Sequence, residues 1–195
     1  MILGSHTTFC AYGFWLPNDP RGSWSDFVRA WELVRFGKAT KVATCRSVAH
    51  VQHDAALRLQ AKSALRYPPV VFTGRQAQSI GNGFARAVTD SGYVIHACSI
   101  LPQHVHVVLA PHERGYRRIA GHLKARATQQ LLADGLHPLS SPAHGTASAP
   151  SPWARLAWHV YLKDALAFRR AIRYVRDNPL KEGKPPQHWT FVTDP

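Results

Sequence analysis

The chain has 195 residues, of which 45% are hydrophobic and 10% aromatic, and its 24 Lys and Arg against 11 Asp and Glu give a formal net charge of +13. This length and apolar content suffice for one domain with a hydrophobic core, and they exclude a disordered polycation. The strong positive charge favours a polyanionic partner, and nucleic acid is favoured over a membrane because the sequence has no basic amphipathic anchor, lipidation motif or apolar run of about 18 residues.

The N-terminal third predicts a strand and then an insertion. Residues 6–16 are rich in β-branched and aromatic side chains and end at the turn residues 17–20, so they predict a strand. Residues 17–70 read as an insertion that contains two short helices. The first begins near Ser25 with Phe27, Trp31 and Val34 on one face, and the second covers 54–65 with Ala56, Leu59 and Ser63 on one side.

The remaining chain alternates helices and strands. We expect a helix over 73–91, a hairpin of strands over 93–101 and 104–110, a helix over 116–133, a flexible loop over 135–152, a strand over 158–162 and a last helix from Asp164 to about Asn178, where Pro179 stops it. Without the insertion the order is βαββαβ plus one helix. The sequence therefore predicts a single α+β domain over 1–195: a ferredoxin-like, split-βαβ sandwich with a central antiparallel sheet and an added C-terminal helix.

His104 and His106 are two residues apart on a predicted strand, so their imidazoles lie side by side on one face while Val105 faces the core. Two convergent histidines can hold one divalent cation, although an exposed polar strand face has the same pattern. Three cysteines without a CxxC spacing argue against a disulfide frame or a cysteine zinc site and fit a reducing cytoplasm.

Tyr174 and Asn178 lie one turn apart on the last predicted helix, on a flank away from the apolar stripe that must face the sheet. The helix and its exit carry a strong excess of positive charge, which is typical of a phosphate-contacting surface. The cations of this surface are Arg169, Arg170, Arg173, Arg176, Lys181 and Lys184, and Arg117, Arg118, Lys124 and Arg126 on the preceding helix extend it.

The insertion combines aromatic and basic residues. Its aromatic side chains either stack on unpaired bases or form the small core of the insertion, and we expect the second. The residues are Trp15, Trp24, Phe27 and Trp31, among Arg21, Arg29 and Arg35.

The segment LPQHVHVVLAP, followed about 70 residues later by AIRYVRDNPLKEGK, resembles the HUH-type single-tyrosine transposases of insertion sequences (IS200-like), and above all the REP-associated tyrosine transposases. The resemblance implies that His104, His106 and Asn178 hold a divalent metal ion, Mg²⁺ or Mn²⁺, and that Tyr174 is the nucleophile. It also implies a DNA-nicking and strand-transferring enzyme that forms a 5′-phosphotyrosine link with single-stranded or hairpin DNA. We accordingly expect a cytoplasmic protein that is associated with the nucleoid, and a homodimer is one option for its assembly.

Two other readings remain open. A non-catalytic protein that binds hairpin or single-stranded nucleic acid would need the same basic surface, although no aromatic RNA-recognition pattern is present. A zinc hydrolase is disfavoured because the sequence has no HExxH motif and no Asp or Glu close to the histidine pair.

Overall fold

The computed structural model describes residues 1–19, 27–28, 30–39, 52–140 and 149–195. Several sequence predictions therefore fall outside the described residues, namely those on Arg21, Trp24, Ser25, Arg29 and Cys45 and on residues 141–148 of the predicted loop.

The centre of the molecule is a four-stranded antiparallel sheet. Its strands are β1 (Gly4–Ala11), β2 (Ile95–Ile100), β3 (His104–Leu109) and β4 (Trp153–Leu162), in the spatial order β2-β3-β1-β4. The main helices are α2 (Gly74–Ser91), α3 (Gly115–Ala133) and α4 (Ala165–Lys181). This order and topology are those of the ferredoxin-like sandwich with one added helix, as the sequence predicts.

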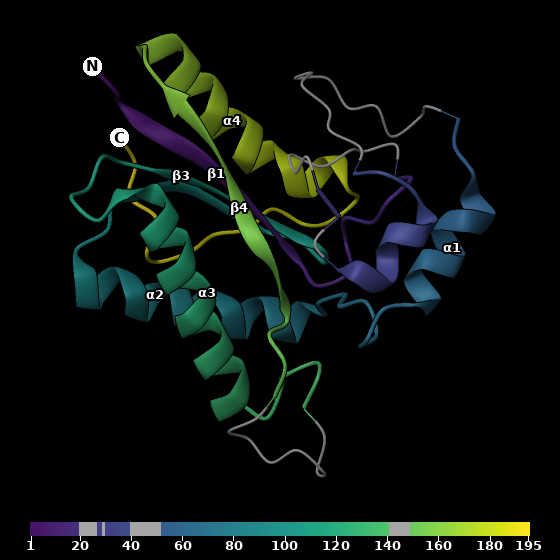
Figure 1. The fold of residues 1–195 in the computed structure, drawn as a ribbon. Coiled ribbons are helices and arrows are strands. Elements are labelled where there is room, and N and C mark those ends of the chain that lie inside the picture. The colour runs from purple at the N-terminus through teal and green to yellow at the C-terminus, as the bar shows by residue number, and fades with distance from the viewer. Residues whose placement is uncertain (20–26, 29, 40–51, 141–148) are drawn as a thin grey trace.

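The helices form two layers, one on each face of the sheet. Figure 1 shows α2 and α3 on one side and α4 on the other. The α2–α3 side encloses the main core, in which Phe9, Ile80, Phe84 and Leu123 are fully buried. The α4 side holds a smaller core, where Ile172 and Val175 pack on Ala97, Val108 and Leu162. The smaller core covers only part of its face, so polar side chains of β1 and β3 lie beside it.

Local signals fix the ends of the helices. The Thr73 hydroxyl accepts a hydrogen bond from the Gln76 amide while the Gln76 side chain accepts one from the Thr73 amide, which forms a capping box at the start of α2. Gly92 ends α2 in a left-handed conformation (φ 65°). The Asp164 carboxylate caps α4 by accepting from the Ala167 amide at 2.8 Å.

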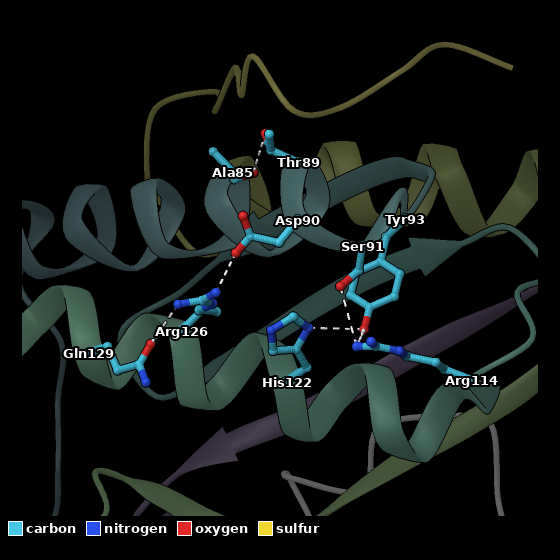
Figure 2. A network of polar contacts seen from close by, with 9 residues as sticks. All are labelled: Ala85, Thr89, Asp90, Ser91, Tyr93, Arg114, His122, Arg126 and Gln129. Atoms are coloured by element: carbon cyan, nitrogen blue, oxygen red, sulfur yellow. Dashed lines mark hydrogen bonds and ion pairs between the residues drawn. The ribbon is translucent and has the colours of Figure 1, made fainter.

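Polar contacts join α2 to α3 on the outer surface of their layer (Figure 2). Arg126 pairs with Asp90 and donates to Gln129 at 3.1 Å. At the other end of the network, Arg114 donates to the Tyr93 hydroxyl at 3.1 Å. The guanidinium group of Arg126 is thus engaged within the protein.

The C-terminal segment closes the β2 edge of the sheet. The Gln187 side chain donates to the Ile100 carbonyl and accepts from the Ile100 amide, both at 2.8 Å. Val192 forms a parallel bridge to Ile95, and Phe191 is buried in the main core. The residues after α4 therefore hold β2 in place, and β2 is the neighbour of β3, the strand that carries the histidine pair.

The first predicted helix of the insertion is wrong in extent and in orientation. Among the described residues of this segment the helix is a 3-10 helix, η1 (Trp31–Phe36), whose buried residues are Leu33 and Phe36. Phe27, Trp31 and Val34, the predicted inner face, are 73%, 85% and 56% exposed. Leu33 and Phe36 are three residues apart, so they lie on one face of a helix with three residues per turn. The prediction assumed the 3.6 residues per turn of an α-helix and therefore selected a different face.

Three other boundaries differ from the predictions. The first strand ends at Ala11 rather than near residue 16, and the fourth begins at Trp153, five residues early. The second insertion helix is α1 (Ala55–Ser63), whose buried residue is Ala61 rather than the predicted set, and Leu59 is exposed.

Pro179 does not stop α4, which continues to Lys181. A proline lacks one amide donor, but the last turn closes around it because the Glu182 amide donates to the Asn178 and Pro179 carbonyls. None of the helices in the described ranges is long and apolar enough to cross a membrane.

Gly83 provides a test of the α2–α3 packing. A Cβ atom at Gly83 would lie 2.7 Å from the Ala127 Cα and the Arg126 carbonyl oxygen, which are backbone atoms and cannot rotate away. We expect Gly83→Ala to lower the free energy of unfolding by about 1–3 kcal/mol. The matched control is Gly121→Ala on α3, where a Cβ atom meets nothing within 4 Å.

The control should be neutral or stabilising by up to about 1 kcal/mol, because alanine has the higher helix propensity. Urea unfolding of the two variants measures both effects. Equal stability of the two variants would contradict this account of the packing.

Candidate active site

The histidine pair lies on β3 with both imidazoles on the face that α4 covers. The ring centroids of His104 and His106 are 4.8 Å apart, and Val105 between them is fully buried in the main core on the other face. His104 also contacts the ring of Phe14. The alternation expected from the sequence is confirmed, and the pair is sheltered because only 7% of His106 is exposed.

Strand β1 holds the His106 ring in place. Thr8 is the Cα partner of His106 in the antiparallel register, and its hydroxyl lies 2.9 Å from His106 Nδ1. His6 Nε2 lies 3.1 Å from the same atom. If Nδ1 of His106 donates to the Thr8 oxygen, Nε2 keeps its lone pair, which is how metal-binding histidines are usually oriented.

Tyr174 reaches the histidines from α4. The centroid of its ring is 5.5 Å from that of His106 and 5.6 Å from that of His6, while 42% of the residue remains exposed. The Lys181 ammonium lies over the same ring, 4.8 Å from its centroid. The phenol is thus in contact with the imidazole cluster on one side and open to a large ligand on the other.

Asn178, one turn after Tyr174, is buried, with 6% of the residue exposed. Its Nδ2 atom makes no hydrogen bond of good geometry within the described part of the chain, and its interaction is a weak one with the Tyr174 hydroxyl. A buried amide group that is poorly paired is costly. A half-turn of the amide would put Oδ1, an acceptor, at the same buried position.

Burial controls the protonation of the cluster. Burial raises the pKa of Tyr174, the nearby Glu182 carboxylate raises it further, and the Asn178 amide lowers it. Burial also lowers the pKa of His6 to about 4 and holds the pKa of His106 well below its usual range. At neutral pH the phenol is therefore protonated and both imidazoles are neutral.

Glu182 corrects the expectation that no acidic residue lies near the histidine pair. Its Oε1 atom is 3.5 Å from His104 Nε2. The residue lies directly after α4, eight positions after Tyr174, so the continuation of the helix past Pro179 brings it to the site. Its distance from His104 in the sequence hides this contact.

His6 and Thr8 are the other site residues that the sequence analysis missed. Residues 5–8 of β1 are all polar (SHTT), so the sequence does not show that His6 and Thr8 are the two that face the histidine pair. Their pairing with His106 depends on the register of two strands about a hundred residues apart. That register is not visible in local patterns.

The donor types at this site fit a divalent cation: the imidazoles of His104 and His106, whose ring centroids lie 4.8 Å apart, the buried Asn178 amide, and the Glu182 carboxylate, 3.5 Å from His104 Nε2. No group of three or more His, Cys, Asp or Glu side chains in the described ranges is already arranged to hold a metal ion. Binding of a cation at this place would thus require a side chain to move or the Asn178 amide to contribute.

The basic residues predicted to contact DNA fall on two different layers. Arg169, Arg170 and Arg173 are exposed on α4, the helix of Tyr174, whereas Arg176 pairs with Asp194. Lys184 is exposed beyond the helix. Arg117 and Arg118, which belong to the same predicted set and are also exposed, lie on α3, which covers the opposite face of the sheet.

Lys124 on α3 is engaged inside the protein. Its Nζ atom donates to the carbonyl oxygens of Ala154 at 2.8 Å and Leu156 at 3.0 Å, and it lies over the Phe9 ring. Burial lowers its pKa to about 8. The lysine therefore joins α3 to the start of β4.

Trp15, Phe27 and Trp31 do not belong to the core of the insertion, contrary to the expectation, and Trp24 lies outside the described residues. Within the described residues that core contains Leu16, Leu33, Phe36 and Ala61. Trp15 and Phe27 instead line an apolar cavity of about 500 Å³ beside the site, whose walls also include Thr8 and Trp158.

No protein-family model and no curated protein matches the sequence. Among solved structures, a REP-associated tyrosine transposase bound to a REP hairpin aligns with a TM-score of 0.48 and 14% sequence identity, covering 94% of this chain and 70% of that chain. A likeness at this level does not identify a function, which has to be inferred from the site itself.

Lys124 gives a pH-dependent prediction. Its pKa is about 8 in the folded protein and about 10.4 in an unfolded chain. At pH values between these two pKa values, Lys124 carries more protons in the unfolded chain than in the folded protein. Lys124 therefore makes the free energy of unfolding rise with pH, by up to about 3 kcal/mol in total.

We expect Lys124→Met to remove that rise. Urea unfolding of wild type and variant at pH 7.5 and pH 10 measures it, because other titrating groups cancel in the difference between the two proteins. If the difference in unfolding free energy between wild type and Lys124→Met is the same at both pH values, burial does not lower the pKa of Lys124.

Proposed function

We propose that the protein is a DNA-strand-cleaving and strand-transferring enzyme of the transposase type, with Tyr174 as its nucleophile. The observation that carries the proposal is the contact of the Tyr174 ring with the His106 and His6 rings, 5.5 and 5.6 Å between centroids. These residues come from α4, β3 and β1 and have no reason to meet for packing alone, since Tyr174 lies outside the apolar stripe of its helix. The motif pair resembling HUH single-tyrosine transposases implies that Tyr174 is the nucleophile and that His106 is a metal ligand.

The chemistry is a balanced exchange at phosphorus. The Tyr174 oxygen attacks a DNA phosphodiester in line, the bond from phosphorus to the 3′ oxygen breaks, and a 5′-phosphotyrosine link forms. The phenol loses a proton and the departing 3′ oxygen gains one. Because the link keeps the phosphodiester energy, a second 3′-hydroxyl can reverse the step and join new strands.

Tyr174 needs assistance, because a phenol with a raised pKa is a weak nucleophile at neutral pH. Lys181, over the Tyr174 ring, favours the phenolate and a bound phosphate by its charge. His104, His106 and Asn178 are the residues that would hold a divalent cation, Mg²⁺ or Mn²⁺. When bound, such a cation supplies charge neutralisation at the scissile phosphate.

Single-stranded or hairpin DNA is the proposed partner. Arg170 lies one helical turn before Tyr174 on the exposed side of α4, and Arg173 is its immediate neighbour. The two guanidinium groups and Lys181 form a cationic surface around the phenol. Backbone phosphates on either side of the scissile bond would lie on this surface.

The nucleophile assignment predicts a covalent adduct that depends on one hydroxyl group. Tyr174→Phe should abolish the protein–DNA adduct formed with labelled single-stranded DNA from the flanks of the gene in the presence of Mn²⁺, while DNA affinity stays within about twofold of wild type because only one oxygen is lost. The matched control is Tyr161→Phe on β4, an exposed tyrosine that contacts Tyr116 rather than the histidines.

Mass spectrometry of the trapped adduct locates the modified residue. A nucleotide attached to another tyrosine, or adduct formation by Tyr174→Phe at the wild-type level, would refute the mechanism. Hairpin binding without any adduct in wild type would instead support the non-catalytic binding protein.

The basic surface gives a second prediction. Arg170→Ala combined with Arg173→Ala should weaken DNA binding and make the slope of log affinity against log salt concentration shallower by about 1.4 for a single strand, because two phosphate contacts are lost. The control pair is Arg117→Ala with Arg118→Ala, which removes the same charge from the opposite layer.

Fluorescence anisotropy over a series of salt concentrations measures both slopes. The control pair should change the slope by less than half as much as the α4 pair. Equal effects of the two pairs would show that DNA contact is not centred on the Tyr174 helix.

A further inference from the structure

Glu182 is the one acidic side chain that contacts the histidine pair within the described residues, and neither the motif resemblance nor the proposed reaction gives it a role. Its Oε1 atom lies 3.5 Å from His104 Nε2, and the two side chains are 37% and 16% exposed. Tyr174, Asn178 and Glu182 follow one another at intervals of four residues along α4 and its C-terminus, so they share one side of the helix.

The distance between the two atoms is informative. A charge-assisted hydrogen bond between an imidazole nitrogen and a carboxylate closes to about 2.7–2.9 Å. Two atoms that bind one metal ion, each at about 2.1 Å, are roughly 3.0–3.4 Å apart for octahedral or tetrahedral angles. The observed 3.5 Å is close to the second value and too long for the first.

The mobility of the three groups differs. The His106 ring is held by Thr8 and His6, and the His104 ring contacts those of His106 and Phe14, nearly perpendicular to the former. Glu182 lies beyond the last residue of α4, and its side chain is the most exposed of the three. Because no converged set of three ligands is present in the described part of the chain, the carboxylate is the group that can move to complete one.

We propose that Glu182 is a further ligand of the divalent cation, which adds a carboxylate to the two imidazoles of His104 and His106 and the Asn178 amide. Such a mixed nitrogen and oxygen set suits Mn²⁺ and similar first-row cations better than Mg²⁺, which prefers oxygen ligands and retained water. The carboxylate also offsets the positive charge that the cation brings to a site that has the Lys181 ammonium over the Tyr174 ring. This inference rests on the cation of the proposed function and adds a residue to its site.

The experiment measures cation affinity in the absence of DNA. The full-length protein at pH 7.5 is titrated with Mn²⁺, and free Mn²⁺ is followed by electron paramagnetic resonance. Glu182→Gln should raise the Kd for Mn²⁺ by about tenfold or more, and Glu182→Asp should raise it less because the carboxylate is retained. Glu113→Gln, an exposed glutamate in the turn before α3, is the control and should bind as wild type does.

Two further outcomes separate this inference from the proposed function. If His104→Ala weakens Mn²⁺ binding but Glu182→Gln binds as wild type or more tightly, Glu182 is a structural partner or a competitor of the cation, and the inference fails while the cation site stands. If wild type binds no Mn²⁺, or His104→Ala leaves the Kd unchanged, the cation site itself fails and Glu182 with it. Thermal unfolding of each variant confirms that the fold is retained.

Discussion

The antiparallel register of β1 and β3 is the constraint on which the rest of the site depends. It sets Thr8 directly opposite His106 and brings His6 to the same imidazole nitrogen. Burying a neutral imidazole costs little only when its nitrogen has a partner, and the neighbouring strand supplies one. A slip of one residue would turn His6 and Thr8 toward the main core, in place of the buried Ser5 and Thr7, and take both partners away from His106.

The two faces of the sheet divide the work of folding and chemistry. The α2–α3 face carries the larger buried hydrophobic cluster, and this core supplies most of the hydrophobic stabilisation. On the other face the smaller cluster takes Ala171, Ile172 and Val175 from α4, with Ala167 and Phe168 partly buried against it. The incomplete apolar cover leaves room for Tyr174 and Asn178 on the same helix to face the histidines, so the smaller core positions the site.

Charge is distributed to match this division. Arg126 and Lys124 on the α3 side are occupied by a carboxylate and by two backbone carbonyls, respectively, and contribute to packing between elements. The arginines of α4 that flank Tyr174 are exposed. A polyanion that approaches the phenol therefore meets solvent-exposed arginines. The charges of Arg126 and Lys124, by contrast, are already paired with groups inside the protein.

The sequence by itself determined the order of elements, and with it the ferredoxin-like fold, because periodicity, capping residues and glycine signals act within a few residues of the chain. It also determined that His104 and His106 share a strand face. Only the tertiary structure decided that β1 supplies His6 and Thr8, that Leu33 and Phe36 rather than the exposed aromatics form the core of the insertion, and that Glu182 reaches His104. Each of these depends on strand register, on a helix that continues past a proline or on packing between distant segments, and such long-range contacts leave no local pattern in a single sequence.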